Sequence, residues 1–175
     1  MKYKNGNKYD GRWKEGEKRG YGILSTDKGA EYRGYWKHDT KNGTGKLLEK
    51  NGTYYDGDWV KDKKHGSGEY YCSKTNLIFD GTFKNNLKDG TMAIRSKNES
   101  TSLISTWKND RIWEGNAIIH EPNGDVYTGQ FVKGKRHKLG TLVFSSSSEP
   151  EKKIVYSGEW KENKREGHGI TTYNK

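Results

Sequence analysis

The chain has 175 residues, of which 29% are hydrophobic and 32% charged, and it carries a net charge of +10. This composition excludes a thick aliphatic core, and no apolar run approaches the ~20 residues that a membrane-spanning helix needs. Disorder is disfavoured by the 13% of aromatic residues and by 23 glycines against 2 prolines.

A motif of the form aromatic-x-Gly-x-aromatic occurs six times along the chain, with a decayed seventh copy at Leu103-Ser105-Trp107. The steps between copies are 23 to 29 residues, which is the signature of a repeat architecture. The steps leave almost no linker, so we expect residues 1–175 to form one array of seven units. The units start at Tyr9, Tyr32, Tyr55, Phe79, Leu103, Tyr127 and Tyr156. We expect degeneracy at 92–106, where the turn glycine is missing, and a loop insertion at 145–153, both as longer mobile loops.

Each unit is predicted to be a β-hairpin. Tyr-x-Gly-x-Trp alternates with period two, so its Tyr, Gly and Trp lie on one face of a strand. A tip of six to eight residues follows, and the second strand starts with Gly-x-Gly, seven residues after the second aromatic residue. Asn-Gly pairs at 5–6, 51–52 and 123–124 predict type I′ turns between units. No segment has a convincing apolar period of 3.6 residues, so we expect almost no helix.

The paired glycines need a physical reason, because glycine usually weakens a strand. We infer that the bare backbone of Gly-x-Gly is the seat of a flat Tyr or Trp ring, so that a single-layer sheet builds its core from aromatic rings. The complete seats are Gly20/Gly22, Gly43/Gly45, Gly66/Gly68 and Gly167/Gly169. Units four to six keep Gly90, Gly115 and Gly140 and replace the second glycine with Met92, Ala117 and Leu142. Met92 and Leu142 accompany the smaller Phe83 and Phe131 instead of Trp, which indicates volume compensation.

A single-layer sheet has no second layer to cover its aromatic face. Ring edges are therefore expected to stay exposed as an apolar strip that binds a partner helix or extended peptide. The alternative is that these rings serve packing alone. The predicted partner-binding residues are Tyr9, Trp13, Tyr32, Trp36, Tyr55, Trp59, Phe79, Phe83, Trp107, Tyr127, Phe131, Tyr156 and Trp160.

The excess of positive charge falls in the predicted hairpin tips, which makes one long edge of the sheet basic. An anionic partner would bind there: an acidic protein, a phosphoinositide headgroup or nucleic acid. Nucleic acid is the weakest of the three, because the aromatic residues that would stack on bases occupy core positions. The alternative is that Lys-rich turns only keep the sheet soluble. The residues of this predicted site are Lys18, Arg19, Lys61, Lys63, Lys64, Lys133, Lys135, Arg136, Lys138, Lys164 and Arg165.

No catalytic, cofactor or metal site is predicted. The five histidines fall in different units without metal-ligand spacing, and Cys72 is expected to be a structural thiol because no base is placed beside it. Gly-x-Gly lacks the following helix and the lysine of a phosphate-binding loop. The single cysteine fits a reducing compartment, and the polar start of the chain does not resemble a signal peptide.

The template resembles the MORN repeat (membrane occupation and recognition nexus), whose pattern is Tyr-x-Gly-x-Trp-x-x-Gly-x-x-x-Gly-x-Gly. The resemblance covers about residues 5 to 173; it is specific in units one to three and seven and weak in unit five. It implies an elongated, curved antiparallel sheet of serial hairpins. It also implies an interaction module that binds partner proteins in a groove, assembles cytoskeletal or axonemal structures, or contacts anionic lipids.

The sequence thus predicts an all-β protein, an elongated single-layer antiparallel meander of about seven hairpins and about fifteen strands. The predicted function is a non-enzymatic scaffold that binds a protein helix or peptide along the aromatic face, within a hetero-complex. The first alternative is a peripheral membrane module that binds anionic phospholipid through the basic tips, and the second is an unrevealed regulatory or hydrolytic activity. The resemblance implies a cytoplasmic protein at the cytoskeleton or cilium, neither secreted nor transmembrane.

Overall fold

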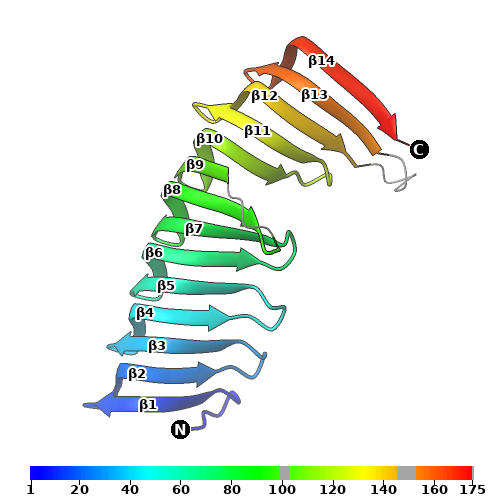
Figure 1. The fold of residues 1–175 in the computed structure, drawn as a ribbon. Helices are drawn as coiled ribbons and strands as arrows, with labels where there is room; N and C mark the ends of the chain where they lie inside the picture. Colours follow the sequence, from blue (N-terminus) through cyan, green and yellow to red (C-terminus); the bar gives the residue numbers. More distant parts are fainter. Residues whose placement is uncertain (99–102, 146–152, 175) are drawn as a thin grey trace.

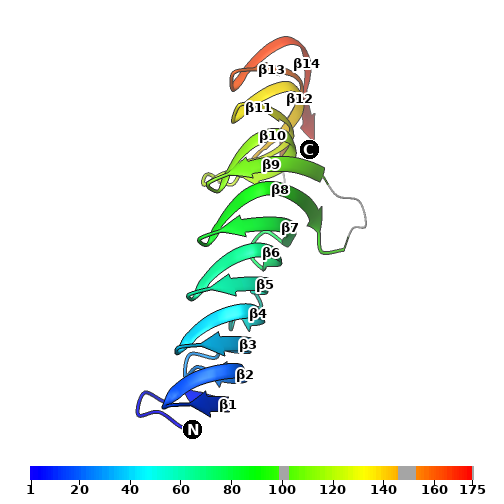
Figure 2. The same cartoon turned by 90° about the vertical axis from the view of Figure 1, so that its left-hand side faces the viewer.

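The computed structural model describes residues 1–98, 103–145 and 153–174. They form one open sheet of fourteen antiparallel strands, each paired with its neighbours in sequence (Figure 1). The predicted all-β, single-layer meander is confirmed. A second view shows a curved ribbon with the two termini at opposite ends (Figure 2). The strands are β1 (Lys8–Lys14), β2 (Glu17–Ser25), β3 (Glu31–Lys37), β4 (Thr40–Leu48), β5 (Tyr54–Val60), β6 (Lys63–Cys72), β7 (Leu77–Lys84), β8 (Leu87–Ser96), β9 (Leu103–Lys108), β10 (Arg111–His120), β11 (Val126–Val132), β12 (Lys135–Phe144), β13 (Lys153–Lys161) and β14 (Lys164–Asn174).

The hairpins close with two-residue turns at one long edge of the sheet, which we call the turn edge. Both turn residues have positive φ, as a type I′ turn requires, and Asn, Asp and Gly tolerate this conformation best. The prediction of six-to-eight-residue tips is wrong, because the Lys-rich segments pair as strands up to the turn. The turns are Glu15–Gly16, His38–Asp39, Lys61–Asp62, Asn85–Asn86, Asn109–Asp110, Lys133–Gly134 and Glu162–Asn163.

The opposite edge, the loop edge, joins one hairpin to the next. In the first such loop, the Gly29 N–H donates to Thr26 O (3.1 Å) and the Thr26 N–H to Ala30 O (2.8 Å). Gly29 has positive φ, so the loop is a type I turn followed by a glycine bulge. The Asn-Gly pairs form the same loop, so the predicted type I′ turns are wrong at this edge. In the loop at Asn51–Gly52, the Asn51 side chain accepts a hydrogen bond from the Thr53 N–H (2.9 Å).

The two glycines of Gly-x-Gly have different roles. Gly20 has positive φ and lies in a bulge that shifts the register between β1 and β2. Gly22 pairs with Gly11, and a Cβ added to it would lie 2.3 Å from the Tyr9 hydroxyl. The seat therefore consists of one glycine from each strand of the hairpin, and only the second glycine of Gly-x-Gly belongs to it. Tyr9 is 1% exposed and its hydroxyl donates to Arg12 O (3.3 Å).

The tryptophans connect each hairpin to the one before it. Trp36 Nε1 donates to the carbonyl of Gly22 (3.1 Å), and Trp59 Nε1 donates to that of Gly45 (2.8 Å). The Trp36 ring also meets the Tyr9 ring edge-to-face, with centroids 5.5 Å apart. Successive units thus share one continuous row of buried rings, which is the core of this sheet and lies on the face we call the aromatic face.

Unit six corrects the sequence alignment of the repeats. Gly140 pairs with Gly129 under the Tyr127 ring, so it is the second glycine of its unit and not the first. Lys138, with a φ of 56°, stands where other units have the first glycine. Leu142 pairs with Tyr127 as Leu24 pairs with Tyr9, and the inferred volume compensation with Phe131 is therefore wrong.

Unit four replaces the seat differently. Met92 pairs with Gly81 and is fully buried, so its side chain fills the volume that a Tyr ring occupies elsewhere. In unit five Trp107 Nε1 donates to Ser105 Oγ in its own strand (2.8 Å), and this bond replaces the one to the preceding unit.

The predicted irregular regions are more ordered than expected where the structure describes them. Of the predicted loop at 92–106, residues 92–96 lie in β8 and 103–106 in β9, whereas 99–102 lie outside the described residues. The predicted insertion at 145–153 falls mostly outside them as well, at 146–152. Near the N-terminus, Lys2 forms a single bridge to Lys8, so the described residues hold fourteen strands and not fifteen.

Candidate interaction site

The aromatic rings of the predicted apolar strip are buried and not exposed, with one exception. Twelve of its thirteen rings are at most 9% exposed, and only Trp13 remains open, at 41%. The expectation of exposed ring edges is therefore wrong, because most of these rings are covered by a basic side chain, and several also by the second aromatic residue of the next unit. Trp13 is open because no described unit precedes it. A partner that approaches the aromatic face meets the covering groups and not the rings.

The covering groups are basic side chains five positions after the second aromatic residue of a unit, which we call the ring cations. Lys41 Nζ lies 4.6 Å from the centroid of the Trp59 ring, and Lys64 Nζ lies 4.2 Å from that of Tyr70. Their charged groups lie over the faces of the rings, so cation–π attraction applies. The ring cations are Lys18, Lys41, Lys64, Lys88, Arg136 and Arg165.

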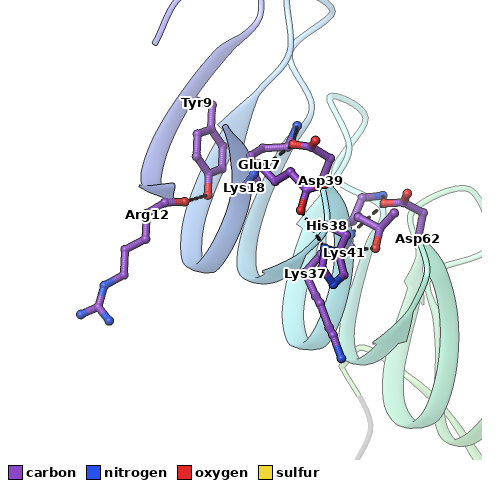
Figure 3. Close-up of polar contacts among 10 residues, drawn as sticks. Tyr9, Arg12, Glu17, Lys18, Lys37, His38, Asp39, Lys41 and Asp62 are labelled. Carbon is purple, nitrogen blue, oxygen red and sulfur yellow. Dashed lines mark hydrogen bonds and ion pairs between the residues drawn. The ribbon is translucent and has the colours of Figure 1, made fainter. Parts of the chain in front are cut away.

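Five of the six ring cations are bonded to the turn of the next unit; Arg165 lies in the last strand. Asp39 accepts the backbone N–H of Lys18 (3.0 Å) and pairs with its ammonium group (3.2 Å) (Figure 3). Asp62 accepts the N–H of Lys41 in the same way (2.9 Å), as Figure 3 also shows. The N–H and ammonium of Lys18 lower the pKa of the Asp39 carboxyl. Burial lowers the pKa of Lys41, and the Asp62 carboxylate opposes that effect.

The sequence contains a signal for the ring cations beyond the predicted basic site. A Lys or Arg stands five residues after the second aromatic residue in six of the seven units, and Ile112 stands there in unit five. The predicted six-to-eight-residue tips include these positions, so the ring cations were not distinguished from the other basic residues of the tips. Four residues of the predicted basic site are ring cations, namely Lys18, Lys64, Arg136 and Arg165.

The remaining residues of the predicted basic site lie elsewhere. Lys61 and Lys133 are turn residues, and Lys138 is the left-handed residue of β12. Arg19 lies in the bulge of β2. Lys63, Lys135 and Lys164 lie next to the turns on the opposite face, and they form part of a larger set.

This larger set consists of the last cross-strand pair before each turn, on the face opposite the aromatic rings. The fourteen positions hold nine Lys or Arg and one acid, Glu17, which gives a net charge of +8. All nine cations are exposed. Three of them, Lys14, Lys135 and Lys161, contact a nearby glutamate. We call them the turn-edge cations: Lys14, Lys37, Lys63, Lys84, Lys108, Arg111, Lys135, Lys161 and Lys164.

Other chemistry-bearing residues are dispersed. In the described part of the chain, no group of three His, Cys, Asp or Glu side chains could hold a metal ion. Cys72 is half-buried at the end of β6, and His38 Nδ1 lies 2.7 Å from Glu17 across two neighbouring hairpins. Within residues 1–98, 103–145 and 153–174, no helix is long and apolar enough to cross a bilayer.

The comparisons with known proteins agree with this repeat geometry. The MORN repeat model matches residues 9–30, 32–54, 55–76, 79–91, 127–149 and 156–175, which is more than half of the chain. Alsin of Rattus norvegicus is 29% identical over 99 residues, a match that covers 53% of this chain and 6% of Alsin. MORN repeats are protein- or membrane-interaction modules. The chain belongs to the MORN repeat family.

Proposed function

We propose that the chain is a non-enzymatic scaffold whose partner is an acidic segment of another protein, bound along the turn-edge cations. The observation that carries this proposal is the placement of charge. Seven hairpins hold a net charge of +8 in one row of positions next to the turns, in which all nine cations are exposed. The ring cations, in contrast, are largely offset by Asp39, Asp62, Asp110 and Glu121. A row of one sign attracts and orients an oppositely charged chain.

The proposed binding face differs from the one that the sequence predicted. The aromatic face offers a partner few rings, whereas the row along the turn edge continues through all seven hairpins. Neighbouring strands are about 4.8 Å apart, so one hairpin contributes its cations roughly every 10 Å. An extended acidic segment would therefore contact several hairpins at once. We propose the same cytoskeletal or ciliary setting that the family resemblance implied.

The test is affinity capture from native cells with charge-reversed variants. Lys63→Glu with Lys108→Glu changes two turn-edge cations, and Lys28→Glu with Lys50→Glu is the matched control at the loop edge, where both lysines are also exposed. We expect the first pair to lose the partner at ~150 mM salt while the control retains it. Equal capture by both double variants would contradict the proposal.

A second candidate is an anionic membrane surface, because three positions of the same row are apolar. Val60 and Leu87 are exposed between the cations, and Val132 is partly exposed. Such a mixture suits the headgroup region of a bilayer. Flotation with phosphatidylserine and phosphoinositide vesicles tests it. Flotation that Lys63→Glu with Lys108→Glu abolishes would favour the membrane over the protein partner.

A further inference from the structure

The junction between units five and six lacks a contact that the other five junctions have, in which the backbone N–H of the ring cation donates to the side chain of a turn Asp or Asn. The ring-cation position holds Ile112, and the turn position that is Asp39 in unit two holds Gly134. The backbone contact has also moved by one residue. The Gly134 N–H donates to Trp113 O (2.9 Å), whereas the Asp62 N–H donates to the carbonyl of the ring cation Lys41 itself (3.1 Å).

A hollow of about 490 Å³ lies at this junction. Its apolar lining comes from Trp107, Ile112, Ile119 and Phe131, and its polar lining from Asp110, Arg111, Glu121, Arg136 and Asn163. The hollow opens where the side chains of a ring cation and its aspartate would lie in a regular unit. Ile112 is shorter than lysine, and Gly134 contributes no side chain.

Regular junctions show which chemistry fits this space. Trp36, Trp59, Trp107 and Trp160 each have a ring cation 4.6 to 5.3 Å from the ring centroid. Phe83 and Phe131 stand at the same place in units four and six, and within the described residues no ammonium or guanidinium group lies over either ring. At Phe83 the ring cation Lys64 lies over the neighbouring Tyr55 and Tyr70, whereas at Phe131 the ring-cation position holds Ile112. An aromatic ring without its cation offers a negative π-face at the base of a partly apolar hollow.

An anionic group for an incoming cation is also present. Glu121 opens the loop after β10 as Glu49 opens the loop after β4, and the Glu49 carboxylate acts on both Lys41 and Lys64. Glu121 is already paired with the guanidinium of Arg136. Glu121 also lines the hollow, and a carboxylate can accept more than one hydrogen bond, so that it is available to a second cation that enters there.

We propose that this hollow binds a Lys or Arg side chain of a partner protein. The aliphatic stem would lie on Ile112 and Phe131, and the charged group would approach Glu121. The partner thus supplies in trans the cation that unit five lacks. The inference does not depend on the row of turn-edge cations, because Arg111 is the one member of that row that lines the hollow and the hollow takes a ligand of opposite charge.

The direct test uses n-butylammonium as the probe and n-butanol as a neutral probe of the same length. We follow the indole N–H resonances of ¹⁵N-labelled protein, with Trp36, whose ring cation is present, as the internal control. We expect butylammonium to shift the Trp107 signal with a Kd about threefold or more below that of butanol, and to leave Trp36 without a saturable shift. Equal or tighter binding of butanol, or no saturable shift at all, would overturn the proposal.

Two variants sharpen this test. Ile112→Lys fills the hollow in cis, and we expect it to abolish the Trp107 shift; a persisting shift would refute the assignment. Lys41→Ala opens the same space at a regular junction, and we expect butylammonium to raise the Tm of this variant more than that of the wild type. Lys63→Ala, at an exposed turn-edge position, is the matched control. A rise of equal size in both variants, or in neither, counts against the proposal.

Failure of this proposal and of the proposed function can be told apart. Ile112→Lys leaves every turn-edge cation in place, so capture of an acidic partner through that row is unaffected by it. Conversely, Lys63→Glu with Lys108→Glu leaves the hollow unchanged, and butylammonium binding should remain.

Discussion

Units one to three and unit five are built on the same hairpin, but they are held to their neighbours differently. In the regular units a Tyr ring covers a glycine pair, a Trp reaches the preceding unit and a Lys reaches the next one. Unit five has Leu103 in place of Tyr, satisfies Trp107 within its own strand and has Ile112 in place of Lys. Unit five keeps its side-chain contacts to unit four through Lys88 and Asp110 but lacks the ring cation toward unit six, so the sheet continues there with fewer side-chain contacts.

The difference coincides with a change in the direction of the strands. In Figure 1 strands β1 to β8 run nearly alike, whereas β11 to β14 are tilted against them, and unit five lies between these groups. With fewer side-chain ties, unit five is the place where the twist of the sheet is least constrained.

The largest expected effect comes from filling a seat. Gly45→Ala places a Cβ 2.3 Å from the Tyr32 hydroxyl, so the ring must leave its position, and we expect a loss of about 3 kcal/mol in the free energy of unfolding. Ala117→Gly, the converse change in unit five, should cost about 1 kcal/mol or less. Urea titration followed by tryptophan fluorescence measures both. Equal midpoints for Gly45→Ala and the wild type would show that the seat does not limit packing.

The next largest effect is expected from removing the indole N–H of Trp59, which bonds unit three to unit two. Trp59→Phe leaves the carbonyl of Gly45 without its donor, whereas Trp107→Phe frees only a serine hydroxyl that can rotate. We expect Trp59→Phe to cost about 1–2 kcal/mol more than Trp107→Phe. Hydrogen exchange should show the extra opening in units two and three together. Opening confined to unit three would mean that the indole does not couple them.

Restoring the template in unit five should stabilise the array. Ile112→Lys with Gly134→Asp recreates the ring cation and its turn aspartate, and Asp39, Asp62 and Asp110 show that the turn tolerates Asp at positive φ. We expect a gain of about 0.5–1 kcal/mol, seen as a higher Tm and as slower amide exchange in β9 and β10. A lower Tm would mean that the apolar contacts of Ile112 outweigh the lost ion pair.

The smallest expected effect is the pH dependence of the contact between Asp39 and Lys18. The Asp39 carboxyl has a lowered pKa in the folded protein, so its stabilising contribution is present above the pKa of the unfolded chain. That contribution is lost as the pH falls through the folded pKa. Asp39→Asn keeps an oxygen acceptor for the Lys18 N–H but does not titrate, so the Tm difference between the two proteins should shrink on acidification. A Tm difference that stays constant down to low pH would show that the Asp39–Lys18 contact does not stabilise the fold through its charge.

The fold was predictable because its information is local. Period-two alternation and the 23-residue step of units one to three specify hairpins, and short connections leave a meander as the simple way to pair them. The Tyr-over-glycine packing was also predictable in kind, since bare backbone in a strand needs something large to cover it.

The site was less predictable, for two physical reasons. Segments such as Lys61–Lys64 have low strand propensity, yet a two-residue turn at Lys61–Asp62 lets them pair, so Lys64 joins the aromatic face and Lys63 the opposite one. The exposure of the rings depends on neighbouring units. One hairpin considered alone has uncovered rings, and only the stacked array shows that the Trp and Lys of adjacent units cover them.

The direction of the backbone hydrogen bonds has a mechanical consequence. They run along the long axis of the ribbon, with the termini at opposite ends (Figure 1). Tension applied between the termini would open the bonds of one strand pair in succession, as a zipper opens, and would not shear them all together. Such a molecule lengthens hairpin by hairpin under a low force, and the first hairpin to yield should be the fifth.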